Sequence, residues 1–335
     1  MKICIAHTKE GVNPLFVTEC MAKGIITNGD TVLHIKNHDD LSKLQDCDVC
    51  ISIAFPYLAG TGEVFCQEEW TNPKLAPSND KTNRFRIAIY QTCKKLGVRQ
   101  IFIDTGLFNF DRERHSVVDN YYQLSYDSIK GMGNYYNDNS PHDRLKDLNI
   151  KIHPWNTQGI HFLIVGQVRF GVGSSHMDIN DWYNYVSEYL KRETPKDLEL
   201  RFRPHPNVKT PPTDRTSPSW IKKCKAGMRP KIVVSNRKPI FEKDFLNVRC
   251  LITFSTHACI DGLIFGCPTI AMSKASLLYK YCYRPLSTVM DPVEIPDRKQ
   301  ILADLAYTQW SNFEMADGTA WGHLKQFYNY PQPIH

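Results

Sequence analysis

Residues 250–272 read CLITFSTHACIDGLIFGCPTIAM, in which two short apolar runs, one at each end, enclose a polar turn and a longer apolar segment. CLITF and PTIAM have the length and the β-branched content of buried strands. ACIDGLIFG, which follows the Ser-Thr turn, is typical of a short helix. A strand, a helix and a further strand in this order predict a parallel βαβ unit and therefore an α/β fold.

The same alternation extends along the rest of the chain in two series, separated by a tyrosine-rich passage at 119–157. We therefore expect two Rossmann-like domains facing across a cleft, an N-terminal domain at 1–157 and a C-terminal domain at 158–335. The expected strands lie at 1–7, 31–35, 47–55 and 98–106 in the first series, and at 159–168, 198–202, 231–235, 250–254 and 268–272 in the second. Two helices close the second domain, one with Ile301, Leu302, Leu305, Trp310 and Phe313 at helical spacing and one through Trp321.

Composition places the chain among ordinary globular proteins. It has 335 residues, 42% of them apolar, and no uncharged apolar run of the roughly 18 to 20 residues that span a bilayer. The start MKICIAHTKEG has no signal-peptide pattern, so we expect a cytoplasmic location, in the host cytoplasm if a bacteriophage encodes the chain. Eleven scattered cysteines favour reduced thiols, and Cys47 with Cys50 are interpreted as strand thiols rather than a metal or redox pair.

Positive charge gathers in one part of the sequence. The net charge is +6, but residues 201–249 contain thirteen Lys and Arg against three acids, a local excess of +10. A polyanionic partner or a phosphorylated ligand would account for this concentration, and a solvated charged face is the alternative.

The segment LELRFRPHPN at 198–207 ends a strand with an arginine and a histidine held by two prolines. Alternation along the strand places Arg203 and His205 on one side, and the prolines favour an extended backbone. Both side chains donate hydrogen bonds to oxygen, so they suit a diphosphate. The alternative is a structural turn in which His205 bonds a neighbouring carbonyl.

Two more polar turns follow expected strands. In CLITFSTHACIDG, the residues Ser255, Thr256 and His257 precede a helix whose first amides favour an anion, and Asp261 could accept from ribose hydroxyls. Simple helix capping is the alternative.

In VGQVRFGVGSSH, a glycine-containing loop presents Gln167 and Arg169. This loop is neither a Walker loop nor GxGxxG, and no convincing pair of metal-binding acids is present, so no metal is expected.

The order of these motifs resembles the C-terminal half of the GT-B glycosyltransferases, in particular capsule-polysaccharide transferases and their bacteriophage relatives. The resemblance covers about 160–325 and includes TQWSNFEMADGTAWGHL at 308–324. It implies that His205, Ser255 and Thr256 hold the phosphates of a nucleotide sugar and that Asp261 contacts the ribose. It also implies a UDP-sugar rather than a CMP-sugar as co-substrate, with no other cofactor.

The N-terminal half resembles the family at IFIDTGLFNF, 101–110, which implies that Asp104 is the general base. A turn acid that accepts backbone amides is the alternative, and Asp127 is the second candidate for the base. A single base without a covalent intermediate would invert the anomeric centre.

The acceptor is expected to be a hydroxymethylated base, 5-hydroxymethylcytosine, in bacteriophage DNA. Basic residues would bind the DNA backbone and tyrosines would stack on an exposed base, although packing of the tyrosines is the alternative. These residues are Lys222, Lys223, Lys225, Arg229, Tyr121, Tyr122 and Tyr126. A capsule or other saccharide transferase and a non-catalytic DNA-binding protein of GT-B shape are the competing interpretations. The sequence does not indicate the oligomeric state.

Overall fold

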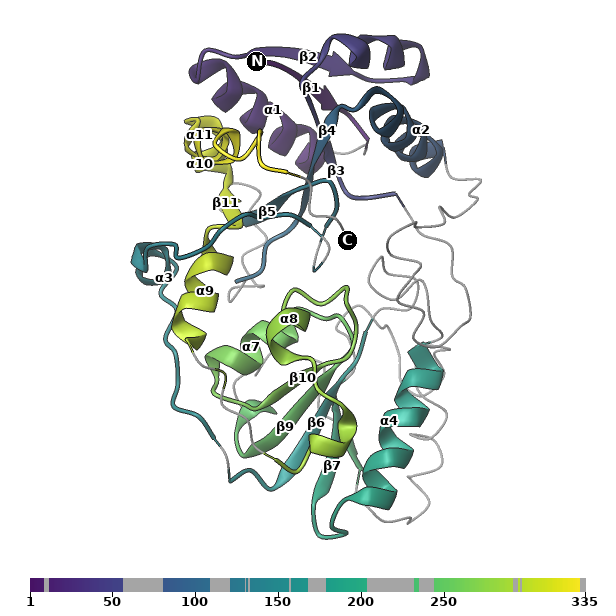
Figure 1. The fold of residues 1–335 in the computed structure, drawn as a ribbon, viewed down its shortest axis with the longest axis vertical. Coiled ribbons are helices and arrows are strands. Elements are labelled where there is room, and N and C mark those ends of the chain that lie inside the picture. The colour runs from purple at the N-terminus through teal and green to yellow at the C-terminus, as the bar shows by residue number, and fades with distance from the viewer. Residues whose placement is uncertain are drawn as a thin grey trace. The chain divides into compact units, whose positions relative to one another are not determined.

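The computed structural model describes residues 1–8, 12–56, 81–108, 121–129, 131, 133–156, 158–167, 179–203, 232–234, 244–291, 295 and 297–331. These residues form two compact units (Figure 1). Unit 1 contains the described residues of 1–57, 75–148 and 300–335, and unit 2 contains those of 149–299.

Unit 1 is built on a mixed sheet of six strands in the order β11-β5-β4-β3-β1-β2. β2, β1, β3 and β4 are parallel neighbours, whereas β5 runs antiparallel to both β4 and β11. The strands are β1 Lys2–Ala6, β2 Thr31–Ile35, β3 Val49–Ile53, β4 Arg99–Thr105, β5 Tyr121–Tyr126 and β11 Gln309–Ser311. The helices are α1 Val12–Thr27, η1 His38–Asp46, α2 Lys81–Leu96, α3 Asp143–Asp147, α9 Arg298–Ala306, α10 Asn312–Ala316 and α11 Thr319–Lys325. The first two residues of α9 belong to unit 2.

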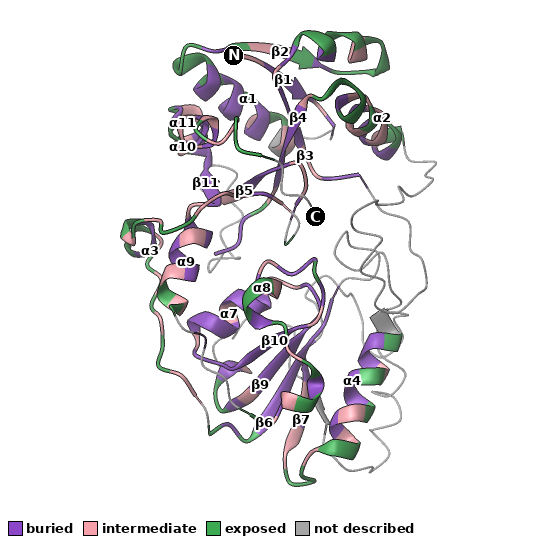
Figure 2. Cartoon of the chain, viewed as in Figure 1, coloured by how far each residue is buried: buried purple, intermediate pink, exposed green. Residues whose placement is uncertain are grey.

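Helices cover both faces of this sheet, because successive side chains of a strand point to opposite faces. Ile3 and Ile5 of β1 pack in one core with residues of α1, and Cys4 packs in another with residues of α2. Figure 1 shows α1 and α2 on the two sides of the strands. Buried positions follow the same pattern in Figure 2, where the outer surface of α2 is exposed.

The C-terminal segment is part of the unit 1 core. Trp310, Met315, Trp321 and Leu324 are buried among the residues of β1 and α1. The helices α1 and α10 approach closely at Gly24, where a Cβ atom would lie 1.8 Å from the carbonyl oxygen of Met315. The contacts therefore place 300–335 with the N-terminal unit, whereas the sequence assigned this segment to the second domain.

Unit 2 is built on a parallel sheet of five strands in the order β10-β9-β6-β7-β8. The strands are β6 His161–Val165, β7 Glu199–Arg203, β8 Ile232–Val234, β9 Val248–Thr253 and β10 Thr269–Ala271. The helical segments are α4 Ile179–Glu193, α7 Ala258–Ile264, α8 Tyr279–Cys282 and η5 Leu286–Thr288. Trp182 and Val186 of α4 pack on Phe162 and Ile164 of β6 in the main core. Close packing of α7 on the sheet uses Gly262, where a Cβ would meet the Leu251 side chain at 2.5 Å.

The expectation of two Rossmann-like α/β domains is confirmed. All nine expected strands occur within the units, but two further strands, β5 and β11, were not expected. Trp310, expected inside a helix, lies in β11 opposite Tyr122 of β5, because β5 would otherwise leave its outer backbone groups unpaired.

Three absences hold for the described part of the chain. No helix there is long and apolar enough to cross a membrane. The nine cysteines described are all buried and form no disulfide. No group of three or more His, Cys, Asp and Glu side chains among the described residues is placed to bind a metal ion.

Candidate functional site

The carboxyl edge of the unit 2 sheet gathers the expected donor-site residues. Gln167 follows β6, and Ser255 and Thr256 follow β9. β6 and β9 are neighbours in the sheet, and the strand order reverses between them. Open α/β sheets bind their ligands outside the carboxyl ends of the strands at such a reversal point. These turns therefore form the candidate nucleotide site.

Gln167 has an unusual environment for a polar side chain. It is only 6% exposed, and its backbone N–H donates to the hydroxyl of Tyr183 at 2.6 Å. Burial raises the pKa of Tyr183, so the phenol stays neutral. The side-chain oxygen Oε1 of Gln167 is buried and has no hydrogen-bond partner among the residues described. A buried acceptor without a partner costs free energy, and a ligand N–H or O–H would satisfy it.

The turn after β9 combines a buried hydroxyl with a short helix. Ser255 is 2% exposed, while Thr256 and His257 are partly exposed. Thr256 Oγ1 accepts from the N–H of Ala258 at 3.4 Å, a long capping contact. α7 has only seven residues, so its dipole adds little, and an anion here would depend mainly on the side chains. Asp261 lies partly exposed in the first turn of α7.

Arg203 is already engaged in this structure. It is 5% exposed and forms an ion pair with Asp244. Its carbonyl accepts from the N–H of Gly166 at 2.7 Å, which ties the ends of β7 and β6 together. A donor phosphate would therefore share Arg203 with Asp244 or displace that carboxylate. Arg169 and His205 lie outside the described residues.

The candidate base is placed at the carboxyl end of β4 in unit 1. Asp104 is partly exposed, and its Oδ1 accepts from the N–H of Thr105 at 2.8 Å. This contact is the one expected for a turn acid, but it occupies one carboxylate oxygen only. Oδ2 of Asp104 makes no hydrogen bond to any described residue. The geometry thus leaves one oxygen available to accept a proton.

Two buried glutamines fix the turn after Asp104. Gln123 Nε2 donates to the carbonyl of Thr105 at 2.9 Å, and Gln309 Oε1 accepts from the amides of Leu107 and Phe108 at 2.7 and 3.0 Å. Both glutamines are fully buried. Neither residue was expected at the site, although a Gln in an otherwise apolar or aromatic strand is a usable signal because a buried amide needs partners.

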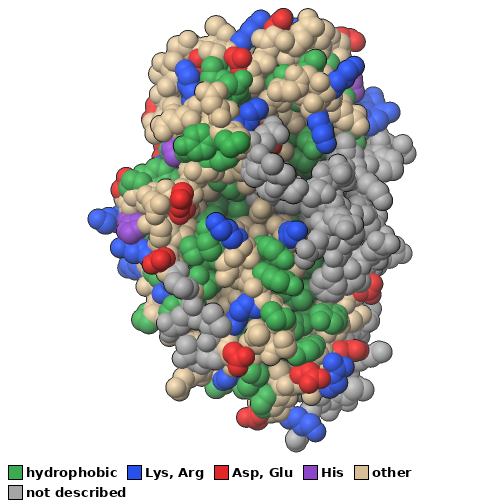
Figure 3. Space-filling model, in the orientation of Figure 1, with side chains coloured by type: hydrophobic (Ala, Val, Ile, Leu, Met, Phe, Trp, Pro, Cys, Tyr) green, Lys and Arg blue, Asp and Glu red, His purple; other side chains and the backbone are tan. Residues whose placement is uncertain are grey.

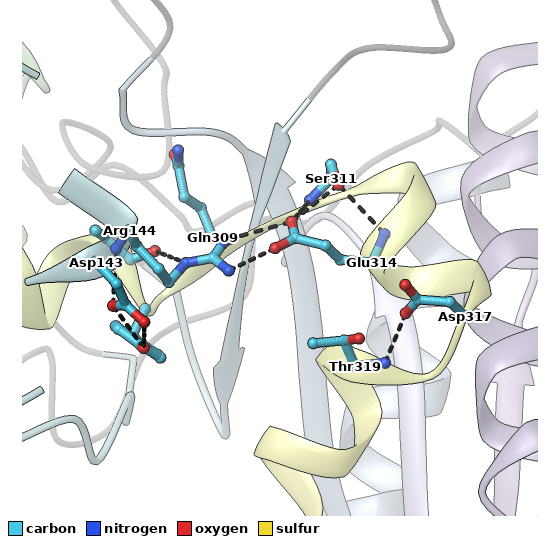
Figure 4. Close-up of polar contacts among 9 residues, drawn as sticks. Asp143, Arg144, Gln309, Ser311, Glu314, Asp317 and Thr319 are labelled. Atoms are coloured by element: carbon cyan, nitrogen blue, oxygen red, sulfur yellow. Dashed lines mark hydrogen bonds and ion pairs between the residues drawn. The ribbon is translucent and has the colours of Figure 1, made fainter. Parts of the chain in front are cut away.

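Arg144 holds Gln309 in place and is itself paired with Glu314 (Figure 4). Arg144 donates to the carbonyl oxygen of Gln309 at 2.7 Å and pairs with Glu314. Glu314 also completes a capping box with Ser311 at the start of α10. The guanidinium lies 4.2 Å from the ring centroid of Trp310. The C-terminal segment thereby supports the turn that carries the candidate base.

Asp127, the second candidate for the base, has a structural role. It forms an ion pair with Arg99 at 2.8 Å, and its backbone has a positive φ of 64°. Arg99 also donates to the carbonyls of Phe327, Tyr328 and Tyr330. The carboxylate of Asp127 is thus engaged by a guanidinium, whereas Oδ2 of Asp104 is not engaged by any described residue.

Of the three tyrosines expected to contact DNA, one is buried inside unit 1 and two are half-buried. Tyr126 is fully buried, and its hydroxyl donates to the carbonyl of Leu324 at 3.0 Å. It has no free face for a base, so its assignment as a stacking residue is wrong. Tyr122 packs against the same core and Tyr121 is half-buried. Lys222, Lys223, Lys225 and Arg229 lie outside the described residues.

Comparison with solved structures gives matches at low identity and with TM-scores below 0.5. No family model matches the chain, and no curated protein matches it. The Thermosulfurimonas dismutans KpsC β-Kdo 2,4-transferase is 11% identical, with 92% of this chain and 91% of that chain covered and a TM-score of 0.49. The β-Kdo 2,7-transferase of the same KpsC is 10% identical, with 97% and 100% covered and a TM-score of 0.49. Anabaena Alr3699/HepE in complex with UDP and glucose is 9% identical, with 97% and 100% covered and a TM-score of 0.36.

The strand orders of the two units define the class of protein to which the chain belongs. It is an α/β protein with two Rossmann-like domains, each with polar residues at the carboxyl edge of its sheet.

Proposed function

We propose that the chain is a metal-independent GT-B glycosyltransferase that moves a sugar from a nucleotide sugar to a hydroxyl acceptor. The observation that carries this proposal is that Gln167 and Ser255 follow the neighbouring strands β6 and β9, at the point where the strand order of unit 2 reverses. The motif order GQVR, RPHP and STHACIDG supports it, because these turns follow β6, β7 and β9, three neighbouring strands.

In the proposed reaction the acceptor hydroxyl attacks the anomeric carbon of the donor. Asp104 takes the hydroxyl proton through Oδ2, the bond from the anomeric carbon to the acceptor oxygen forms, and the bond to the donor phosphate oxygen breaks. The nucleotide leaves with the electron pair of that bond. One base and no covalent intermediate give inversion at the anomeric centre.

The turns of unit 2 would stabilise the leaving nucleotide. Ser255, Thr256 and His205 donate hydrogen bonds to its phosphate oxygens, and each such donor contributes about 3 to 4 kcal/mol when charge grows on the oxygen. Asp261 accepts from the ribose. Gln167 Oε1 accepts from an N–H or O–H of the nucleotide, which removes its unsatisfied state. We propose UDP as the nucleotide.

Replacing Asp104 by Asn tests the catalytic role. Asn cannot accept the proton, so turnover of the nucleotide sugar should fall about 100-fold to 10,000-fold while donor affinity stays unchanged. Asp46→Asn, at an exposed position of η1, is the matched control. Turnover unchanged by the Asp104 substitution would remove it as the base. A protein that binds DNA but transfers no sugar from any donor would be the non-catalytic alternative.

Replacing Gln167 by Ala tests the donor site. UDP affinity, measured by calorimetry, should fall about tenfold, since one buried hydrogen bond to the nucleotide is lost. Gln158→Ala, an exposed glutamine ahead of β6, should leave affinity unchanged. CMP and GDP in the same measurement test the choice of nucleotide. Equal binding of UDP by the wild type and the Gln167 variant would contradict the proposed donor site.

The identity of the acceptor is tested with labelled nucleotide sugars. The acceptors are hydroxymethylated DNA, unmodified DNA and saccharide primers. Two acceptors compete: the basic segment 222–243 favours hydroxymethylcytosine in DNA, whereas the burial of Tyr126 removes one expected base-stacking residue and favours a saccharide. Label only in the DNA would establish the first acceptor, and label only in the saccharide would establish the second.

A further inference from the structure

A cavity with basic walls lies within unit 1, away from Asp104. Its volume is about 590 Å³, a size that fits a small phosphorylated molecule. The described residues that line it come from the end of β1, the start of η1 and the start of α2. They are His7, Thr8, Lys36, Asn37, His38, Lys81, Thr82, Arg84 and Phe85.

The cavity lies where α/β sheets bind ligands. The five strands β2-β1-β3-β4-β5 have the flavodoxin-like order, in which the reversal point falls between β1 and β3. Thr8 spans this point, because its hydroxyl donates to the carbonyl of Ile53 at the end of β3, at 2.7 Å. The cavity opens beside it, at the carboxyl ends of β1 and β2.

The described part of the cavity wall carries an excess of positive charge. Lys36, Lys81 and Arg84 form no ion pair with any described residue, and none of the described lining residues is an acid. The nearby Asp40 is engaged by Lys43 Nζ at 2.6 Å and by the backbone N–H of Lys36. α2 carries five Lys and Arg and no acid, and blue side chains gather over its position in Figure 3. The described walls therefore attract an anion.

The start of one helix at the cavity adds to this attraction. η1 also starts there, but the side chain of its N-cap Asn37 accepts from the backbone N–H groups of Asp39 and Asp40, and both acids lie in its first turn, so this end adds little. α2 has sixteen residues, of which Lys81, Thr82 and Arg84 in its first turn line the cavity. The first backbone amides of a helix carry a partial positive charge and favour phosphate.

Rings form another part of the wall. The ring of His38 lies 5.2 Å from that of Phe85. His7 and His34 share a hydrogen bond of 2.9 Å between ring nitrogens, and their rings are stacked. A planar or apolar wall beside cations suits a ligand that carries an uncharged part next to its phosphate.

We propose that this cavity binds the phosphate of a small phosphorylated saccharide, which serves as the acceptor substrate. Its role as acceptor site rests on the proposed glycosyl transfer. β4, which carries Asp104, is two strands from β1 and three from β2, so the strand ends that form the cavity lie about 10 to 15 Å from the end of β4 along one edge of the sheet. A saccharide with its phosphate in the cavity reaches Asp104 with a distal hydroxyl.

The compact shape favours a single phosphate over a nucleic acid. Duplex DNA carries a charge every 1.7 Å or so along its axis, and its binding depends on cations that follow the backbone. The cations of the cavity instead converge on one volume, Lys81 and Arg84 from the start of α2 and Lys36 from the end of β2.

Direct binding tests the cavity independently of any transfer. Glucose 6-phosphate is titrated into the full chain by calorimetry, with glucose as the uncharged comparison. Lys36→Gln and Arg84→Gln should each weaken its binding about tenfold, the loss of one charged hydrogen bond. Lys95→Gln, at an exposed position in the last turn of α2, removes the same charge outside the cavity and should change nothing. Equal affinity of the wild type and both cavity variants would overturn the proposal.

Two further measurements separate this proposal from the proposed function. UDP affinity should be the same in wild type and both cavity variants, because the donor turns lie in unit 2. Loss of glucose 6-phosphate binding with UDP binding intact supports the cavity site. A different result is that a hydroxymethylated oligonucleotide binds through Lys36 and Arg84 and glucose 6-phosphate does not bind. This result would overturn the saccharide assignment but would not contradict the proposed glycosyl transfer. If glucose 6-phosphate binds through both residues but the chain transfers no sugar, the binding site is supported and its role as acceptor site is excluded.

Discussion

Asp30 joins the two ends of unit 1 through one carboxylate. Its side chain is 2% exposed and pairs with the N-terminal amine of Met1. It also accepts from Trp321 Nε1 at 2.7 Å and from Lys325 Nζ at 2.8 Å. Burial alone would raise the pKa of Asp30, but these donors outweigh it and lower the pKa to about 2. The charged form of Asp30 therefore stabilises the fold.

We expect Asp30→Asn to lower the free energy of unfolding of unit 1 by about 3 kcal/mol at pH 7, because two cations lose their buried partner. A lowered pKa in the folded state means that this stabilisation is complete above pH 4 and disappears as the pH falls to 2. The difference between wild type and variant should shrink over that interval. Urea unfolding at several pH values measures it, with the exposed Asp39→Asn as control. A difference that does not depend on pH would contradict the assignment.

His161 is a buried histidine whose ring makes no hydrogen bond to any described residue. It is fully buried at the start of β6, and neither ring nitrogen has a partner among the described residues. Burial, and then the charge of Arg201, lower its pKa to about 4, against the opposing effect of Glu199. The folded protein therefore holds a neutral imidazole that the unfolded chain would protonate below about pH 6.5.

We expect His161→Leu to make unit 2 more stable, by about 1 kcal/mol at pH 7, because an apolar side chain leaves no unsatisfied nitrogen. The gain should increase as the pH falls from 6.5 to 4, where protonation favours the unfolded wild type. Thermal unfolding followed at a series of pH values measures the gain. If the variant is less stable than wild type at every pH, the ring has a partner that the described residues do not show.

At the scale of elements, the turn after β4 shows what the sequence could and could not predict. The strand and its terminal Asp104 follow from the apolar run VRQIFID and the glycine behind it. Gly106 is required there, since a Cβ would lie 2.5 Å from the carbonyl oxygen of Tyr121. The support from Gln309 could not be predicted, because it joins residues about two hundred positions apart. The capping box of Ser311 and Glu314, by contrast, is visible in the sequence SNFE.

We expect Gln309→Leu to loosen this turn without unfolding the unit. The amides of Leu107 and Phe108 would lose their acceptor and exchange hydrogen faster, by about tenfold. If Asp104 is the base, turnover should fall while UDP affinity stays unchanged, since Gln309 acts by positioning. Gln309→Glu keeps an acceptor oxygen and should restore slow exchange of both amides. Unchanged exchange in the Leu variant would show that the contact does not hold the turn.

At the scale of the whole molecule, the order of elements was predictable and the closure of unit 1 was not. Most strands and helices with a clear local periodicity occur where the pattern indicates, including β6, β7 and β9, whereas β5, β11 and the strand position of Trp310 were not predicted. The unit against which the last 36 residues pack depends instead on tertiary contacts. Gly24 allows α10 to pack closely on α1, and Asp30 accepts hydrogen bonds from Trp321 and Lys325. A local sequence pattern predicts neither contact.

Unit 1 should therefore not fold without residues 300–335. Their removal takes Trp310, Met315, Trp321 and Leu324 out of its core, uncovers the edge of β5 and leaves Asp30 with one partner instead of three. We expect the chain 1–299 to lose slow hydrogen exchange in β1 and β4 while β6 and β9, in the core of unit 2, keep it. Removal of 332–335 alone is the control and should preserve both sets. Slow exchange retained in β1 and β4 of the shortened chain would mean that the N-terminal strands make a stable core without the C-terminal segment.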